Sequence, residues 1–129
     1  MQDKRWKKLE PLANGAVRHE YYGDEQPVIA VIGFGSTYGA VREGVDMARA
    51  DGLSVGAFYP RVLGPFPVDA VRDFTANAST VVVPEVNYSG QLARVLRSEV
   101  GISVDSRAKC DGLPYTAEDI YEMITEAAR

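Results

Sequence analysis

The sequence predicts an α/β fold: a three-layer α/β/α sandwich whose central sheet is mostly parallel. Short aliphatic runs alternate four times with amphipathic stretches of helical period, and the connections between them are short. Strands that are joined in this way by crossover helices lie parallel and have helices on both faces. The chain has 129 residues, of which 46% are hydrophobic, and these values fit one globular domain.

The first strand–helix unit is the clearest. Val28–Ile32 is a near-continuous aliphatic run, which predicts a strand buried on both faces of the sheet. The glycine-rich turn Gly33–Gly39 follows, and its glycines favour a sharp turn and a close approach of the helix to the sheet. Apolar residues at helical spacing from Val41 predict a helix that ends at Asp51-Gly52.

The next units keep this order. Leu53–Tyr59 predicts a second strand, and Pro67 suits the first turn of the helix after it. Ser79–Val86 predicts a third strand. We expect that strand to leave regular pairing near Pro84, because proline has no N–H to donate to a central ladder.

The last units complete the alternation. Apolar residues at helical spacing follow Gln91, and Gly101 suits the left-handed position at which that helix would end. Ile102–Ala108 predicts a fourth strand. Thr116 and Asp119 are spaced as a capping box for the closing helix.

The N-terminal region differs in composition from the rest. Residues 1–15 are predicted to be a linker or N-terminal stub, and residues 16–129 the domain. Trp6 and Leu9 lie among basic residues, and they belong either to a solvated linker or to a contact with another domain of a longer chain. His19–Tyr22 predicts a short edge strand.

Charge and composition narrow the classes of function. The net charge of −4 and the pI near 5.0 do not favour a nucleic-acid partner or an anionic membrane. No apolar run approaches the ~20 residues that span a bilayer, and the basic N-terminal residues lack the apolar segment of a secretory signal. The single Cys110 excludes an internal disulfide and fits a cytoplasmic protein, while its reactivity is left open.

The glycine-rich turn is a first, weak candidate for a ligand site. Its backbone N–H groups, at the start of a helix, could hold a phosphate. The spacing does not match a dinucleotide fingerprint, because the third glycine comes one residue too late, and no P-loop lysine follows. Close strand–helix packing explains the glycines equally well. The residues concerned are Gly33, Gly35, Ser36, Thr37 and Gly39.

The segment after the third strand is a second candidate. Polar side chains directly after an aliphatic strand could orient a ligand or contact a partner at the carboxyl edge of the sheet. Alternatively, the asparagine and serine cap the next helix while the glutamate accepts hydrogen bonds from loop N–H groups. The residues concerned are Glu85, Asn87, Ser89, Gly90 and Gln91.

Conventional catalytic sets are missing from the sequence. The chain has one histidine and one cysteine, far apart in the sequence, and no G-x-S-x-G elbow. No carboxylates are paired at a spacing that suggests acid–base work, and no metal-ligand pattern occurs. We therefore predict no catalytic and no metal-binding residue in this chain.

Three stretches together carry a family resemblance: GFGSTYGAVREGVDMARADGLSVGAFYPRVLGPFP, VVVPEVNYSGQLARVLRSEVG and KCDGLPYTAEDI. They resemble the C-terminal domain of the α subunit of 2-oxoacid:ferredoxin oxidoreductases, especially the 2-oxoglutarate type. The resemblance covers residues 20–120, and E-x-N-x-S-G-Q is its most specific motif, followed by G-x-G-S-T-x-G. The N-terminal KRWKKLE is similar to the family's interdomain linker. The chain departs at Pro84, where an aliphatic residue is usual, and at Cys110, where an aromatic residue is common.

The resemblance implies a transketolase C-terminal-like fold, with five strands of which the first is antiparallel. It also implies an intact enzyme that oxidatively decarboxylates a 2-oxoacid, most simply 2-oxoglutarate, to an acyl-CoA. That enzyme would use thiamine diphosphate, Mg²⁺, iron–sulfur clusters and CoA, none of them bound by this chain alone. Its active site would lie between the remaining α-subunit domain and the β subunit, with ferredoxin as electron acceptor. This chain would then be an accessory and assembly domain, inactive alone, with a homodimer left open.

An alternative of a different class is an independent nucleotide- or metabolite-binding module. It would use the turn Gly33–Gly39. Tight binding of a nucleotide by the isolated domain favours this alternative over the accessory domain.

Overall fold

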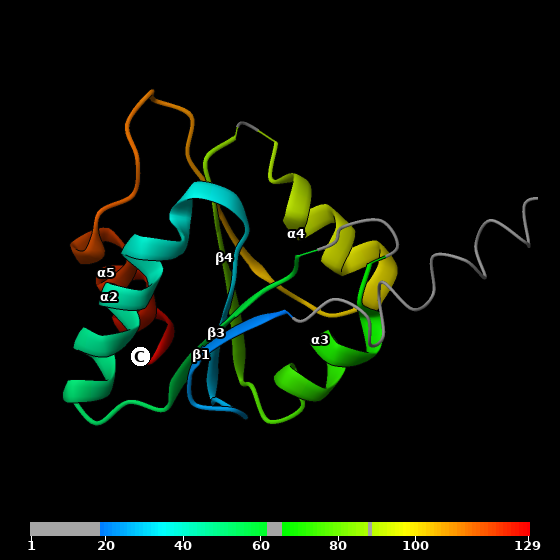
Figure 1. Ribbon diagram of the computed structural model, residues 1–129, viewed down its shortest axis with the longest axis horizontal. Helices are drawn as coiled ribbons and strands as arrows, with labels where there is room; N and C mark the ends of the chain where they lie inside the picture. The colour runs from blue at the N-terminus through cyan, green and yellow to red at the C-terminus, as the bar shows by residue number, and fades with distance from the viewer. Residues whose placement is uncertain (1–18, 62–65, 88) are drawn as a thin grey trace, which may run out of the picture.

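The computed structural model describes residues 19–61, 66–87 and 89–129 (Figure 1). The expected linker at residues 1–15 lies outside these residues. The described part forms one five-stranded mixed sheet with the strand order β1-β3-β2-β4-β5. The strands are β1 (Glu20–Gly23), β2 (Ile29–Ile32), β3 (Val55–Tyr59), β4 (Thr80–Glu85) and β5 (Asp105–Ala108).

The directions of the strands confirm the expected fold class. β1 pairs antiparallel with β3, and the β2–β3, β2–β4 and β4–β5 pairs are parallel. The strand expected at residues 19–22 is therefore the antiparallel edge strand. The three central strands are buried along nearly their whole length, as their continuous aliphatic sequences require when helices cover both faces.

Helices cover both faces of the sheet, so the described part of the chain has three layers (Figure 1). One core lies between the sheet and helices α2 (Tyr38–Ala50) and α5 (Ala117–Ala127). The other core lies between the sheet and helices α3 (Val68–Thr75) and α4 (Gln91–Val95). Along β2, alternate side chains enter opposite cores: Val31 packs towards α2 and α5, and Ile32 packs towards α3 and α4.

The first unit differs in detail from the sequence prediction. A 3-10 turn, η1 (Gly35–Thr37), precedes α2, and α2 begins at Tyr38 rather than at Val41. Among the turn's glycines, Gly33 is closely packed, since an added Cβ would lie 2.7 Å from the Tyr59 hydroxyl oxygen of β3, and within α2 a further glycine, Gly44, allows a close approach to α5. Gly39 has no atom within 4 Å of such a Cβ, so close packing does not explain it.

β4 leaves its pairing with β2 before Pro84, as expected, but it does not leave the sheet there. Pairing of β4 with β2 ends at Val82, but β4 continues beside the edge strand β5, with Pro84 opposite Arg107 and Glu85 opposite Ala108. The proline is tolerated because it lies beyond the part of β4 that has neighbours on both sides. The strand therefore carries Glu85 to the carboxyl edge of the sheet.

The end of the fourth helix and the start of α5 lie where the sequence indicates. The fourth helix continues from α4 into a π-helical segment, η2 (Leu96–Val100), and Gly101 ends it with φ +77°. The capping box of α5 is present: the Asp119 N–H donates to the Thr116 hydroxyl at 3.1 Å, and the Thr116 N–H donates to the Asp119 carboxylate at 2.9 Å.

Candidate functional site

The two candidate loops meet in one cleft at the carboxyl edge of the sheet. β2 and β4 are neighbours, but the chain leaves β2 towards β3 and leaves β4 towards β5. Such a point, where consecutive connections diverge, opens a crevice between the two loops. The cleft has a volume of about 250 Å³. Its lining comes from both loops: Phe34, Gly35, Ser36, Thr37, Glu85, Val86, Asn87 and Gln91.

Glu85 forms the base of the cleft and holds the start of α4. Its side chain is only 3% exposed. Its carboxylate accepts hydrogen bonds from the Leu92 N–H at 2.6 Å and the Ala93 N–H at 3.1 Å. These N–H groups belong to the first turn of α4, where the helix itself offers no acceptor and the helix dipole favours a negative charge. The Glu85 carboxylate therefore caps the start of α4 from the opposite end of the loop.

Asn87 completes this local network. Its amide donates to Glu85 Oε1 at 3.0 Å, and its carbonyl oxygen accepts from the Gly90 N–H at 2.7 Å. Gly90 has φ +63°, and a Cβ there would lie 2.8 Å from the Ser106 hydroxyl of β5. A glycine is required at this position for both reasons. These contacts support the cap interpretation for Glu85 and Asn87, while Gln91 remains exposed at the mouth.

Tyr59 holds the glycine-rich turn from below. Its hydroxyl shares a buried hydrogen bond of 2.6 Å with the Thr37 hydroxyl. Burial raises the pKa of Tyr59 well above its ordinary value, with a smaller opposing effect from Thr37. A Cβ at Gly33 would lie 2.7 Å from the Tyr59 hydroxyl oxygen, so Gly33 makes room for this bond. The turn is thus fixed by internal contacts.

Two exposed apolar side chains line the cleft, and the sequence reasoning did not single them out. Phe34 is 41% exposed and Val86 is 45% exposed. Val86 directly follows β4, and Phe34 is separated from the end of β2 by one residue. An apolar residue at such a position is easily interpreted as part of the buried strand. The available signal was their position: Phe34 lies between two glycines, and Val86 lies between Glu85 and Asn87.

The remaining candidates lie outside the cleft lining. Gly33 lies behind the turn, and Gly39 is exposed on the first turn of α2. Ser89 is half-buried and does not cap α4, whose N-cap residue is Gly90. Cys110 is exposed and free, on the loop that follows β5.

The cleft offers little for acid–base chemistry. Among the described residues that line it, Glu85 is the ionisable side chain, and both of its oxygens already accept hydrogen bonds. Across the described ranges, no group of three or more His, Cys, Asp or Glu side chains could hold a metal ion. No helix in this part of the chain is long and apolar enough to cross a membrane.

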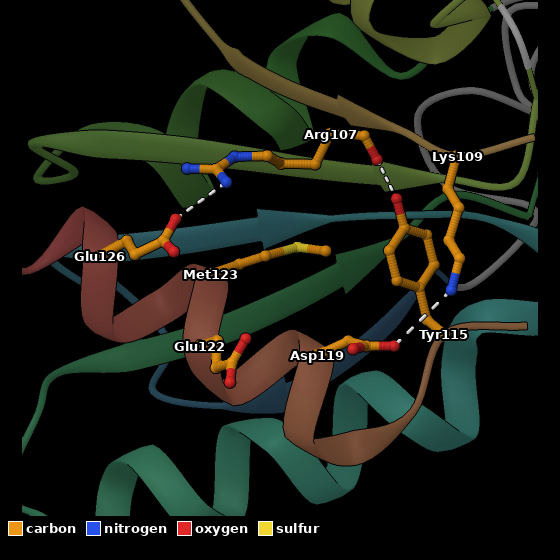
Figure 2. Close-up of a pocket in the computed structure, with 7 residues that line it drawn as sticks. All are labelled: Arg107, Lys109, Tyr115, Asp119, Glu122, Met123 and Glu126. Carbon is orange, nitrogen blue, oxygen red and sulfur yellow. Dashed lines mark hydrogen bonds and ion pairs between the residues drawn. The ribbon is translucent and has the colours of Figure 1, made fainter.

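A second cavity of about 270 Å³ lies between β5 and α5 (Figure 2). Basic and acidic side chains face each other across it and pair. Arg107 contacts Glu126 at 2.9 Å, and Lys109 lies 3.8 Å from Asp119. The Tyr115 hydroxyl donates to the Arg107 carbonyl oxygen. These pairs fasten α5 to the edge strand, so we interpret the cavity as a structural charge network.

Fold and cleft together define the class: an α/β domain of the transketolase C-terminal type, with loops that converge at the topological switch point. A solved split-gene transketolase, described as an inactive beta4 tetramer, has this fold, with a TM-score of 0.68 over 85% of this chain and 41% of that chain, at 20% identity. Residues 28–120 match the family described as pyruvate:ferredoxin oxidoreductase core domain II. The chain belongs to this family.

Similar proteins agree with the assignment. The 2-oxoglutarate oxidoreductase subunit KorA of Mycobacterium tuberculosis is 36% identical over 77% of this chain and 15% of that protein. Subunit alpha of 2-oxoacid:ferredoxin oxidoreductase 2 of Aeropyrum pernix is 30% identical over 88% of this chain and 18% of that protein. The 2-oxoglutarate:ferredoxin oxidoreductase of Magnetococcus marinus, solved with 2-oxoglutarate, coenzyme A and succinyl-CoA bound, has a TM-score of 0.92 and 36% identity over all of this chain and 23% of that chain.

The chain is much shorter than these relatives. It spans 15% and 18% of the two curated proteins and 23% of the solved chain. The relatives are named as subunits, so they function in assemblies of several chains. The shared part corresponds to this α/β domain.

Proposed function

We propose that this chain is an accessory and assembly domain of the α subunit of a thiamine-diphosphate-dependent 2-oxoacid:ferredoxin oxidoreductase. The intact enzyme would decarboxylate a 2-oxoacid oxidatively to an acyl-CoA in the cytoplasm and pass electrons through iron–sulfur clusters to ferredoxin. 2-Oxoglutarate is the substrate that the names of the KorA relative and the Magnetococcus enzyme support. The remaining α-subunit domain and the β subunit are the proposed partners.

The cleft at the switch point carries the proposal. It joins exposed Phe34 and Val86 to the exposed polar side chains Ser36 and Gln91. Its buried polar groups, on Glu85 and Thr37, are already bonded within the domain. A surface that combines exposed apolar and polar side chains on a rigid support suits contact with another polypeptide better than it suits chemistry.

The described residues of the cleft do not fit thiamine diphosphate with Mg²⁺. A magnesium diphosphate site needs free oxygen ligands, usually carboxylates. The cleft's carboxylate, Glu85, has both oxygens engaged by N–H donors of α4 and Asn87. The proposal therefore assigns the cofactor to the partner domains, and no step of the reaction to this chain.

A matched pair of valine variants tests the proposal. Val86 in the cleft is 45% exposed, and Val28, before β2 at the opposite edge of the sheet, is 46% exposed. The chain is mixed with the remaining α-subunit domain and the β subunit, and assembly is followed by mass photometry. We expect Val86→Ser to weaken assembly roughly tenfold and Val28→Ser to leave it unchanged, because burying a valine at an interface contributes about 1–2 kcal/mol.

Both variants should melt within about 2 °C of the parent, because each side chain is exposed. Equal assembly by the two variants contradicts the cleft as the interface.

Calorimetry with ATP, NAD, CoA and thiamine diphosphate tests the alternative of an independent binding module. Micromolar binding of a nucleotide, lost in Ser36→Ala, supports that alternative.

A further inference from the structure

A groove of about 490 Å³ lies between the edge strand β1 and helix α3, away from the cleft. Tyr21 forms its aromatic floor together with Phe74. Tyr21 is 51% exposed, although its ring makes edge-on contacts with Phe58 at 5.0 Å and Phe74 at 5.9 Å between centroids. α3 thus leaves part of an ordered aromatic surface uncovered at the edge of the sheet.

The rim of this groove is acidic. Glu25 and Asp73 are both exposed, and the described lining residues include no basic side chain. Burial and the negative charge of Asp73 raise the pKa of Tyr21. Gln26 is engaged in local bonds, since its amide donates to the Asp73 carbonyl oxygen at 3.5 Å and accepts from Asn77 at 2.9 Å. A complementary ligand combines positive charge with an apolar ring.

We propose that this groove is the docking site of the chain's own basic segment, residues 4–9. That segment reads KRWKKL, with four basic residues around Trp6 and Leu9. The cations match the acidic rim, and the indole and leucine match the aromatic floor. The inference is independent of the proposed function.

The connection between segment and groove is long enough. Ten residues, 10–19, separate the segment from β1, and they reach at most about 36 Å when extended. β1 has only four residues and carries Tyr21 itself. A tether of this length places the segment at millimolar effective concentration near the groove, so weak contacts suffice for docking.

Trp6 reports directly on the docking, because it is the single tryptophan of the chain. The test uses the full 129-residue chain and measures the emission maximum and quenching by acrylamide. We expect Trp6 to emit at shorter wavelength than a synthetic peptide of residues 1–12, and to be quenched less. Raising the salt concentration to about 1 M should reduce this protection, because exposed charge pairs are screened.

Charge-reversal variants locate the docking site. Glu25→Lys with Asp73→Lys should shift the docked-to-undocked ratio about tenfold towards undocked, because two exposed attractions become repulsions. The control, Glu43→Lys with Glu122→Lys, makes the same charge change at exposed positions on α2 and α5, and should leave the ratio unchanged. Adding Lys7→Glu and Lys8→Glu to the groove variant should restore protection.

Three outcomes would overturn the proposal. Quenching of the parent chain equal to that of the free peptide means that the segment does not dock. An equal response of groove and control variants means that it docks elsewhere. Protection that falls on dilution means that the segment binds a second copy of the chain. Melting temperatures and circular dichroism of each variant confirm that a loss of protection is not unfolding.

Discussion

Glu85 shows how one residue of a sequence motif can serve structure instead of chemistry. A carboxylate after a buried strand at a sheet's carboxyl edge is typical of active sites in α/β folds. Here its two oxygens meet the Leu92 and Ala93 N–H groups, which have no partner within α4. The side chain is buried because the loop folds over it, and Asn87 donates to it from that loop.

We predict that Glu85→Ala lowers the free energy of unfolding by about 2–4 kcal/mol. The substitution leaves two buried N–H groups without acceptors and removes a negative charge from the start of a helix. Glu85→Gln keeps one acceptor oxygen and should cost about half as much. Chemical denaturation measures both variants, with the exposed Glu122→Ala on α5 as control. A Glu85→Ala variant as stable as the control contradicts the capping role.

Gly33 and Tyr59 are packed against each other beneath the glycine-rich turn. We predict that Gly33→Ala destabilises the domain by about 1–3 kcal/mol, because its Cβ would lie 2.7 Å from the Tyr59 hydroxyl oxygen. Tyr59→Phe alone should cost about 1 kcal/mol by removing the bond to Thr37. Combined, the two should cost less than their sum, since the phenylalanine removes the nearest clashing atom. Strict additivity in thermal or urea unfolding would mean that the clash is relieved elsewhere.

Helix α2 contains two glycines with opposite effects on how the helix packs. An added Cβ at Gly44 would lie 2.6 Å from Ile120 and 3.1 Å from the Ala117 carbonyl oxygen, so α2 and α5 can approach only because that position has no side chain. Gly39, in the first turn of the same helix, faces open space. Both glycines weaken the helix by their backbone freedom.

We therefore predict opposite signs for two alanine substitutions in one helix. Gly39→Ala should raise the stability by about 0.5–1 kcal/mol, because alanine favours the helix and meets no neighbour. Gly44→Ala should lower it by at least about 2 kcal/mol, because α5 must shift. Each variant is the control for the other in the same denaturation experiment. A stabilising Gly44→Ala would mean that the α2–α5 contact is looser than described.

The capping box of α5 predicts a pH dependence. Hydrogen bonds from the Thr116 backbone N–H and hydroxyl, and the charge of Lys109, lower the pKa of Asp119 from its ordinary value of 3.8, against a smaller opposing effect of burial. Its contribution to stability is therefore present above that ordinary value and lost as the pH falls through the lowered value. The melting temperatures of the parent and Asp119→Asn should differ at pH 7, and the difference should shrink as the pH falls below 3.8. A difference that persists in acid contradicts this assignment.

For the whole molecule, the sequence pattern predicted the layers and the positions of the strands, but not the order of the strands in the sheet. Aliphatic runs such as Val28–Ile32 are long enough to specify buried strands, and the capping box specifies a helix start without tertiary information. The sequence could not show that the strand stays paired at Pro84, because this depends on which side of β4 has a neighbouring strand at that residue. A one-dimensional pattern contains no strand order.

Because the sequence does not give the strand order, it also predicted the candidate site only in part. The sequence identified both loops, and strand order then placed them on one cleft. It could not show that Glu85 and Thr37 are engaged inside the domain, since Leu92 is seven residues from Glu85 and Tyr59 is 22 residues from Thr37. The exposed apolar residues Phe34 and Val86 were missed, because only the fold shows that they lie beyond the sheet. Together these features support the proposed surface for assembly.

The concentration dependence of activity in the Val86→Ser enzyme tests the assembly role most directly. The chain is combined with the remaining α-subunit domain and the β subunit, and 2-oxoglutarate-dependent reduction of ferredoxin is measured over a range of protein concentrations. We predict that activity is lost at low concentration and recovers at high concentration, with an unchanged KM for 2-oxoglutarate, because an interface defect is overcome by mass action. A loss of kcat that persists at every concentration, or turnover by this chain alone, would contradict the account.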